Sequence, residues 1–490
     1  MCIVETKNGA VKGVREDGVL KWRGIPYARP PLDELRFAAA QPVENWEGVK
    51  DASRFGAIAV QNRKRKDMSE DCLTLNIWSK NTGGKRPVLL YLHGGAFMDG
   101  SGSDPEYEGT ILVNECDVVL VTINYRLGVL GFVDFSFLGE GFDANPGLTD
   151  ILQALKWTYE NIEAFGGDAN NITVVGQSAG AYCVSALCVM PSARPYMSKG
   201  IMMSGAPTLM HEKKKAHSIG QSFMDYAGIK NGTELKSVAA QELAAKQPGF
   251  RRHCGLGSAT YCISVDGELL PGYPIPLAAQ GKAKIPVLIG TARDEMSFLF
   301  IKPFNDRLDM GRVFEAGVDG EGTEDARRIE RAYDIYGKRS RHMLMSDLVF
   351  RMASVWFGEA LSAHADVWMY RFDYATAATA LSGLRAFHST DMMFLFGNYK
   401  ASFMRAIFLL SPVKTGINRV AREMRSDFAH FAETGQLDWQ KCDGAHTPGR
   451  CYGGKNRVEQ VVPPEIKSAY ENSRFRRRSF SGASNNLSEL

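Results

Sequence analysis

The sequence has no apolar run long enough to cross a membrane, and Met1–Lys7 does not begin a hydrophobic stretch of signal-peptide length. A strong charge of either sign is also missing, because 58 lysines and arginines and 55 aspartates and glutamates give a net charge of +3. This balance gives no case for a nucleic acid or an anionic membrane as the main partner. We therefore expect a cytoplasmic protein that binds neither nucleic acid nor membranes.

Motifs that bind common cofactors are missing as well. There is no H-E-x-x-H zinc motif, no G-x-G-x-x-G after a strand and no phosphate-binding P-loop, so we expect no metal and no cofactor. The nine cysteines are an odd number, and in a reducing compartment they are most simply free thiols. Cys254 and Cys262, like Cys442 and Cys451, are close enough in sequence for a disulfide, and the sequence leaves both pairings open.

The stretch that carries the chemistry is residues 176–180, a G-x-S-x-G segment with Ser178 at its centre. The β-branched run 172–175 before it predicts a buried strand, and the Ala-rich run 181–187 after it predicts a helix that packs close to a sheet. A serine hydroxyl is a weak nucleophile that needs a base beside it and a sharp turn to expose it. The two glycines of the segment lack the Cβ atoms that would clash in such a turn.

Apolar runs of strand length alternate with helical patterns along the chain. Residues 3–23 predict a small antiparallel hairpin, and an amphipathic helix is expected over 147–165. The strands that we expect in a large, mostly parallel sheet flanked by helices, and thus an α/β fold, lie at residues 70–78, 87–92, 118–125, 172–175, 286–290 and 367–372. Residues 1–472 are expected to form one domain with helical cap insertions around 211–262 and 297–345. The arginine-rich stretch 473–490 is expected to be a mobile tail.

A glycine-rich loop, residues 93–97, follows the predicted strand 87–92. Such a loop aims consecutive backbone N–H groups at one point, so Gly95 and Ala96, with Ala179 behind the serine, are the candidate oxyanion donors. His93 is expected to orient this loop rather than to act as the base, because it precedes the serine in the chain.

The acid and the base should follow the serine, since the α/β-hydrolase order is serine, acid, histidine. The loop after strand 286–290 offers Asp294 and Glu295, and the residues themselves leave open which of the two is the acid. His388 lies in a loop beyond strand 367–372 and is the best-placed base. The histidines that lack this placement are His211, His217, His253, His342, His364, His430 and His446.

With these motifs in order, the sequence resembles the type-B carboxylesterase family, which includes p-nitrobenzyl-esterase-like enzymes, carboxylesterases and cholinesterases. The resemblance runs from about Val11 to about Gly435. The blocks that carry it are 24–37, 69–78, 93–97, 124–128 and 165–168, together with the serine and histidine segments.

The resemblance implies an α/β-hydrolase fold with Ser178 as nucleophile, Glu295 rather than Asp294 as acid and His388 as base. It also implies that Ser204 lies near the histidine, where it has a possible supporting role. Two buried ion pairs, Arg36 with Glu70 and Arg126 with Asp150, are implied as structural elements.

The sequence departs from the family pattern at several places. Gln177 stands where many members have Glu, and the stretch between residues 55 and 70 lacks the aromatic-bearing loop with which cholinesterases hold a quaternary ammonium. Both departures argue against a choline ester as substrate. Met296 replaces the usual Gly after the acid, which puts a flexible apolar side chain beside the acid loop.

These features predict a serine carboxylesterase that hydrolyses small-molecule esters through an acyl-enzyme. One alternative is a catalytically silent adhesion or binding protein of the same fold. The other is an amidase, carbamate hydrolase or lipase with the same triad, since pocket shape decides among these substrates. The sequence determines neither the acyl preference nor the oligomeric state.

Overall fold

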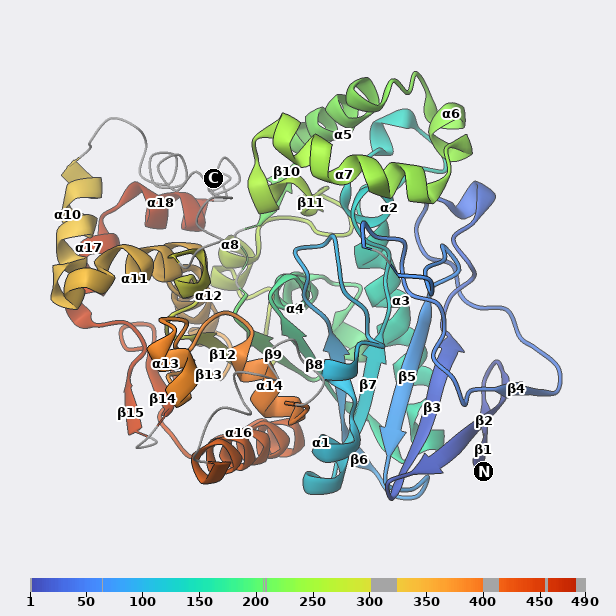
Figure 1. Cartoon of the computed structure of the whole chain (residues 1–490), viewed down its shortest axis with the longest axis horizontal. Helices are drawn as coiled ribbons and strands as arrows, with labels where there is room; N and C mark the ends of the chain where they lie inside the picture. The colour runs from blue at the N-terminus through green and yellow to red at the C-terminus, as the bar shows by residue number, and fades with distance from the viewer. Residues whose placement is uncertain are drawn as a thin grey trace.

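A long mixed sheet runs through the middle of the molecule (Figure 1). The computed structural model describes residues 2–63, 65–205, 207, 209–300, 324–399, 414–453 and 457–481. In these residues the sheet has thirteen strands in the order β1-β2-β3-β5-β7-β6-β8-β9-β12-β13-β14-β15, with β4 paired to β2. The strands are β1 (Cys2–Thr6), β2 (Gly9–Glu16), β3 (Val19–Pro26), β4 (Val49–Asp51), β5 (Thr74–Ser79), β6 (Arg86–Leu92), β7 (Val119–Ile123), β8 (Gly167–Gln177), β9 (Lys199–Met203), β12 (Val287–Ala292), β13 (Val367–Phe372), β14 (Pro448–Tyr452) and β15 (Arg457–Gln460).

The centre of the sheet is parallel from β7 through β6, β8, β9, β12 and β13 to β14. Its strands are covered on both faces, which is why β6 and β7 are continuous apolar runs. The antiparallel pairs lie at the two ends, where β1, β2 and β3 form a meander and β15 returns along β14. The prediction of a mostly parallel sheet is confirmed. Residues 3–23, expected to form a hairpin, lie instead in a three-stranded antiparallel meander, one strand more than a hairpin has.

Helices cover both faces of the sheet. One face packs against α3 (Pro146–Asn161), α4 (Ala179–Val189), α8 (Pro274–Ala279) and α12 (Met352–Ser362), and the other against α1 (Thr110–Glu115), α14 (Thr390–Phe396) and α16 (Lys414–Thr434). The helix expected over 147–165 is α3 followed by a 3₁₀ turn at Ile162–Phe165, which Gly166 ends in the left-handed conformation. The remaining helices are α2 (Val129–Phe132), α5 (Lys213–Ala227), α6 (Gly232–Ser237), α7 (Ala240–Cys254), α10 (Glu324–Ala332), α11 (Ser340–Ser346), α13 (Ala377–Leu381), α17 (Pro464–Glu471) and α18 (Arg474–Ser481).

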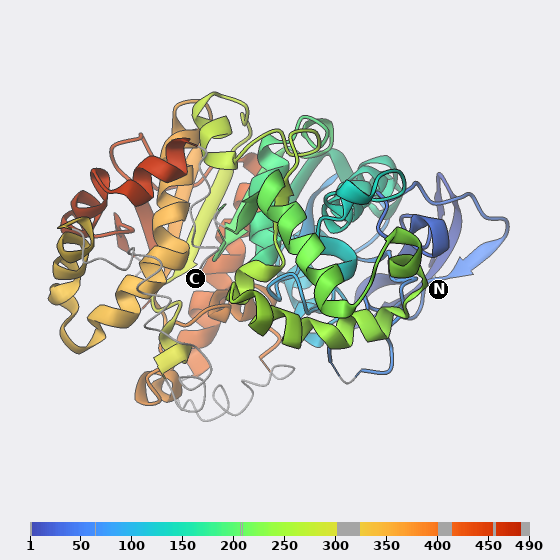
Figure 2. The ribbon, with the colours of Figure 1, turned by 90° about the horizontal axis from the view of Figure 1, so that it is seen from above.

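Two excursions leave the sheet where the cap insertions are expected. Between β9 and β12 the chain forms α5, α6 and α7, together with a small parallel sheet of β10 (Met210–Glu212) and β11 (Ile263–Val265). These green helices lie above the sheet in Figure 1, and Figure 2 shows the yellow to red C-terminal elements on their left. The second excursion carries α10 and α11, and its residues 301–323 lie outside the described residues.

The C-terminal stretch differs from the expected mobile tail. Residues Arg474–Ser481 form α18, whose Phe475 and Phe480 pack against the core and whose Arg476 bonds Glu359 at 3.0 Å. The packing of these two aromatic side chains holds the short helix on the core, which the number of arginines in the segment does not indicate. Residues 482–490 lie outside the described residues.

Two further expectations concern cysteines and membranes. All nine cysteines are free thiols, so neither Cys254/Cys262 nor Cys442/Cys451 forms a disulfide. Among the helices of the described chain, none combines the length and the apolar character needed to span a bilayer.

Candidate active site

Ser178 lies at the tight turn between β8 and α4. Its backbone has φ +53° and ψ −122°, a strained conformation for a residue with a side chain, and its N–H donates to Met203 O at 2.9 Å. A Cβ atom at Gly176 would overlap the backbone of Gly180, and one at Gly180 would overlap the carbonyl oxygen of Leu92. The two glycines are therefore required by the close approach of strand and helix, as the sequence predicts.

The loop after β6 lies against this turn. Gly95, Ala96 and Phe97 have φ values of +123°, +52° and +60°, so the backbone turns sharply three times in succession. Among the described residues the N–H groups of Gly95 and Ala96 donate to no protein acceptor, and Ala179 is the first residue of α4. Gly95 and Ala96 are thus candidate oxyanion donors with no acceptor among the described residues, and Ala179, as the first residue of its helix, has no intrahelical acceptor.

His93 holds the loop after β6 in place. Its ring stacks on Tyr125 with centroids 4.3 Å apart, and its Nδ1 bonds Gly94 O at 2.8 Å. Burial lowers the pKa of His93 to about 4, so the ring is neutral at neutral pH. The Tyr125 hydroxyl in turn donates to His93 O at 2.6 Å, which agrees with the predicted orienting role.

Glu295 and His388 meet at the carboxyl ends of β12 and β13. His388 Nδ1 lies 2.7 Å from Glu295 Oε2, and the second oxygen, Oε1, accepts the N–H of Ala292 at 2.7 Å. The two loops are also joined along the backbone, because His388 N–H donates to Glu295 O at 3.1 Å. Glu295 is fully buried, whereas the His388 side chain is 17% exposed.

Asp294 faces away from this pair. Its carboxylate lies 3.1 Å from His342 Nε2 and 3.6 Å from Arg339 Nη1. The choice between the two adjacent acids, which the residues alone leave open, is therefore decided by geometry in favour of a Glu295–His388 contact.

The other ring nitrogen of His388 faces Gln177. Nε2 lies 3.3 Å from Gln177 Nε2, and the same amide nitrogen donates to Ser389 Oγ at 2.7 Å. In the part of the chain that the structure describes, no hydrogen bond joins Ser178 Oγ to the ring. The Gln177 contact was not predicted, because the sequence shows only that a charge is missing there.

A second buried carboxyl lies under the pair. Asp391 accepts the Tyr370 hydroxyl at 2.8 Å, and burial together with the nearby charge of Glu295 raises its pKa to about 6. Its only signal in the sequence is its place three residues after His388, which is too weak to single it out.

The remaining family-implied residues have structural positions. Arg36 Nε bonds Glu70 Oε1 at 2.7 Å and Arg126 Nη2 bonds Asp150 Oδ1 at 2.6 Å, so both implied ion pairs are confirmed. Ser204 is fully buried with φ +51°, and its Oγ has no hydrogen-bond partner among the described residues. A supporting role for Ser204 stays a prediction.

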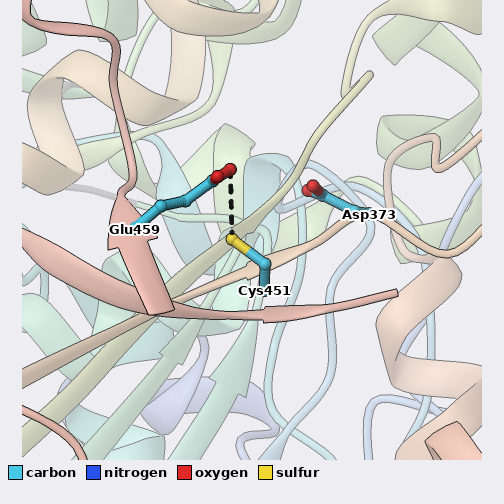
Figure 3. A group of neighbouring side chains, drawn as sticks. All are labelled: Asp373, Cys451 and Glu459. Atoms are coloured by element: carbon cyan, nitrogen blue, oxygen red, sulfur yellow. Dashed lines mark hydrogen bonds between the residues drawn. The ribbon is translucent and has the colours of Figure 1, made fainter. Parts of the chain in front are cut away.

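One cluster of possible metal ligands lies away from this site. Asp373, Cys451 and Glu459 bring their ligand atoms within 4.8 Å of one another, and Figure 3 shows the Cys451–Glu459 contact of 3.5 Å. Arg371 bonds both carboxylates, with 2.7 Å from its Nε to Asp373 Oδ1, and burial raises the pKa of the Cys451 thiol to about 12. A guanidinium already neutralises the acids and the thiol is protonated, so these residues do not fit a metal ion.

Known proteins resemble this chain over most of its length. The model of the carboxylesterase family matches residues 2–447. Para-nitrobenzyl esterase of Bacillus subtilis (strain 168) is 38% identical over 449 residues, covering 88% of this chain and 90% of that protein. Phenmedipham hydrolase of Pseudarthrobacter oxydans is 33% identical over 417 residues, covering 81% of this chain and 83% of that protein.

Solved structures show the same similarity in three dimensions. A PNB esterase structure superposes with a TM-score of 0.87 at 34% identity, covering 96% of this chain and 99% of the other. A Geobacillus stearothermophilus carboxylesterase superposes with a TM-score of 0.84 at 33% identity, covering 96% of this chain and 100% of the other. The expected α/β-hydrolase fold is confirmed.

Proposed function

The chain belongs to the carboxylesterase family and is a carboxylic ester hydrolase, and on this premise we propose that Ser178, His388 and Glu295 form its catalytic triad. The observation that carries the proposal is the 2.7 Å contact between Glu295 Oε2 and His388 Nδ1, beside the strained turn that exposes Ser178. Glu295 accepts a hydrogen bond from the Nδ1–H of His388, so the proton stays on Nδ1 and Nε2 keeps the lone pair that makes it the basic end of the ring.

The reaction then proceeds by acyl transfer. His388 Nε2 takes the Ser178 proton as Oγ attacks the ester carbonyl, and the N–H groups of Gly95, Ala96 and Ala179 receive the negative charge on the carbonyl oxygen. Each such donor contributes about 3 kcal/mol to transition-state stabilisation in related sites. The protonated ring gives its proton to the leaving alcohol, and a water activated by the same ring releases the acid.

Proton transfer requires the Ser178 hydroxyl to come within hydrogen-bond reach of Nε2, where the Gln177 amide now lies at 3.3 Å. Catalytic hydrogen bonds are often long before substrate binds and tighten in the complex. We therefore assign to Gln177 the role of holding the His388 ring before substrate binds, while its own amide is anchored on Ser389. Substrate binding then releases the ring from Gln177.

A fluorophosphonate probe tests the nucleophile. We expect wild-type protein to be labelled, Ser178→Ala to be unlabelled, and Ser185→Ala, a matched change of a buried serine in α4, to be labelled like wild type. Labelling that survives in Ser178→Ala would overturn the assignment, and a binding protein without activity would not label at all. Rates on p-nitrophenyl esters of increasing acyl length then define the acyl preference.

Two finer points complete the proposal. The relative named phenmedipham hydrolase supports phenmedipham as a second substrate to assay beside the esters. The nine free thiols support a reducing compartment and hence a cytoplasmic location, which a cell-fractionation measurement checks.

A further inference from the structure

We propose that the segment Ser346–Arg351, centred on a π-helical turn, is a positioning device that holds the acid and the base of the triad in one geometry. The inference rests on the triad proposed above and adds residues that no catalytic motif of the sequence includes. The turn η10 (Asp347–Arg351) joins α11 to α12, and α12 packs against β12 and β13, the two strands whose ends carry Glu295 and His388 (Figure 1).

The π-helical turn decides which side chains face the site. Met352 N–H bonds Asp347 O, five residues back rather than four, so the turn holds one residue more than an α-helical turn. Two consecutive residues, Phe350 and Arg351, consequently both reach the active-site loops. Single π turns of this kind inside helices are common at functional sites.

Arg351 holds the acid loop. Its guanidinium is 2% exposed and donates to the carbonyl oxygens of Ala292 and Arg293, each at 2.7 Å, and to Thr291 Oγ1 at 3.1 Å. Asp347, which is fully buried, pairs with the same guanidinium and neutralises it. The N–H of Ala292 in turn donates to Glu295 Oε1, so the guanidinium binds the carbonyl of the same residue whose N–H holds the carboxylate.

Phe350 holds the base. Its ring stacks on the His388 ring with centroids 4.6 Å apart and an interplanar angle of 27°. An aromatic face attracts a cation, so this ring favours the imidazolium that forms when His388 takes the serine proton. The imidazole is thus confined by Glu295 at one edge and by Phe350 on one face.

Ser346 fixes the end of the acid loop. Its Oγ accepts the N–H of Met296 at 3.0 Å and donates to His342 O at 2.7 Å. Met296, the residue that departs from the family pattern, is therefore held by its backbone N–H.

The competing explanation is that Phe350 only fills the hydrophobic core. The variant Phe350→Leu distinguishes this explanation from the proposed positioning of His388. If the ring positions the base, kcat on p-nitrophenyl butyrate falls about 5- to 30-fold while KM stays within about twofold, as expected for loss of one cation–π contact. The rate of fluorophosphonate labelling should fall by the same factor, and Phe350→Tyr, which restores a ring, should recover most of it.

Phe357→Leu is the matched control. Phe357 lies in α12, is fully buried and is not stacked on His388, so the same truncation there should lower thermal stability without changing kcat by more than about twofold. Equal kcat losses in the two variants, or an unchanged kcat in Phe350→Leu, would overturn the proposal.

Arg351→Lys tests the acid side. Lysine keeps a charge for Asp347 but presents a single point instead of a planar fork, so it cannot bind both carbonyls and Thr291 at once. We expect kcat to fall about tenfold at unchanged KM, in line with misplacement of a catalytic group. If Arg351→Lys does not fold, the comparison of Phe350→Leu with Phe357→Leu still decides.

The outcomes distinguish this inference from the proposed function. Loss of labelling in Ser178→Ala with normal kcat in Phe350→Leu would leave the triad intact and refute the positioning device alone. Labelling that persists in Ser178→Ala would refute the triad, whatever the Phe350 variants show.

Discussion

Replacing Glu295 with Gln exchanges one oxygen for an NH₂ group in a fully buried site and should nearly abolish activity. Glu295 now accepts two hydrogen bonds, from His388 Nδ1 at 2.7 Å and from the N–H of Ala292 at 2.7 Å. A glutamine has one acceptor and one NH₂ group, so one of the two contacts must become donor against donor.

Both orientations of the new amide are harmful. If its oxygen faces Ala292, its NH₂ faces His388 Nδ1, and the ring must move its proton to Nε2, which then cannot accept the serine proton. If its oxygen faces His388, the Ala292 N–H is buried without an acceptor, which costs about 1–3 kcal/mol of stability. The first orientation avoids that penalty and should dominate.

We therefore expect kcat to fall by about 10⁴, or roughly 5 kcal/mol, as in a serine triad whose acid is replaced by its amide. The assay is steady-state hydrolysis of p-nitrophenyl acetate and butyrate, with thermal unfolding measured on the same samples. Asp294→Asn is the matched control, because that carboxylate contacts His342 and Arg339 instead, and its kcat should stay within about tenfold of wild type. A folded Glu295→Gln protein that keeps more than a tenth of its activity would refute the role of Glu295.

Three changes elsewhere test the supporting structure. Gly180→Ala places a Cβ against the carbonyl oxygen of Leu92, so we expect a loss of at least about 1–3 kcal/mol of stability and a large loss of esterase activity, measured by thermal unfolding and p-nitrophenyl acetate hydrolysis. Arg126→Met leaves the buried Asp150 unpaired and should lower the unfolding free energy by about 3–5 kcal/mol, measured by urea titration. Burial lowers the pKa of His211 to about 4 from an ordinary 6.5, so the unfolded chain takes up this proton first as the pH falls. The free energy of unfolding therefore loses up to about 3 kcal/mol through His211 as the pH falls from about 6.5 to 4, and nothing above about pH 6.5. In His211→Gln the free energy of unfolding should depend less on pH over that window. An unchanged pH dependence would contradict the assignment.

The elements that position the nucleophile could be predicted because their signals are local. Apolar runs predict the strands β6, β7, β8, β12 and β13, since a strand buried on both faces consists of a nearly continuous run of apolar residues. The glycines around Ser178 predict the turn, because only a residue without Cβ tolerates the close packing of β8 and α4.

The tail shows where such reasoning fails. Composition alone favours a solvated, mobile segment, whereas Phe475 and Phe480 of α18 both pack on the core. Whether a short helix forms depends on the surface available to it, which lies more than a hundred residues away in the chain at Glu359.

By itself the sequence determined the fold class, the serine at its turn, the loop with free amides and the two loops on which an acid and a base should lie. It could not choose between Asp294 and Glu295 from the residues alone. Adjacent side chains on a turn point in different directions, and which of the two carboxylates reaches the histidine depends on the side chains packed around the turn. The tertiary structure decided that Glu295 meets His388 across 93 residues and that Gln177 lies against the same ring. It also decided that Phe350 stacks on that ring and that Arg351 binds the carbonyl oxygen of Ala292. These contacts join distant segments, and the chain folds them together through the packing of the whole sheet rather than through any short pattern.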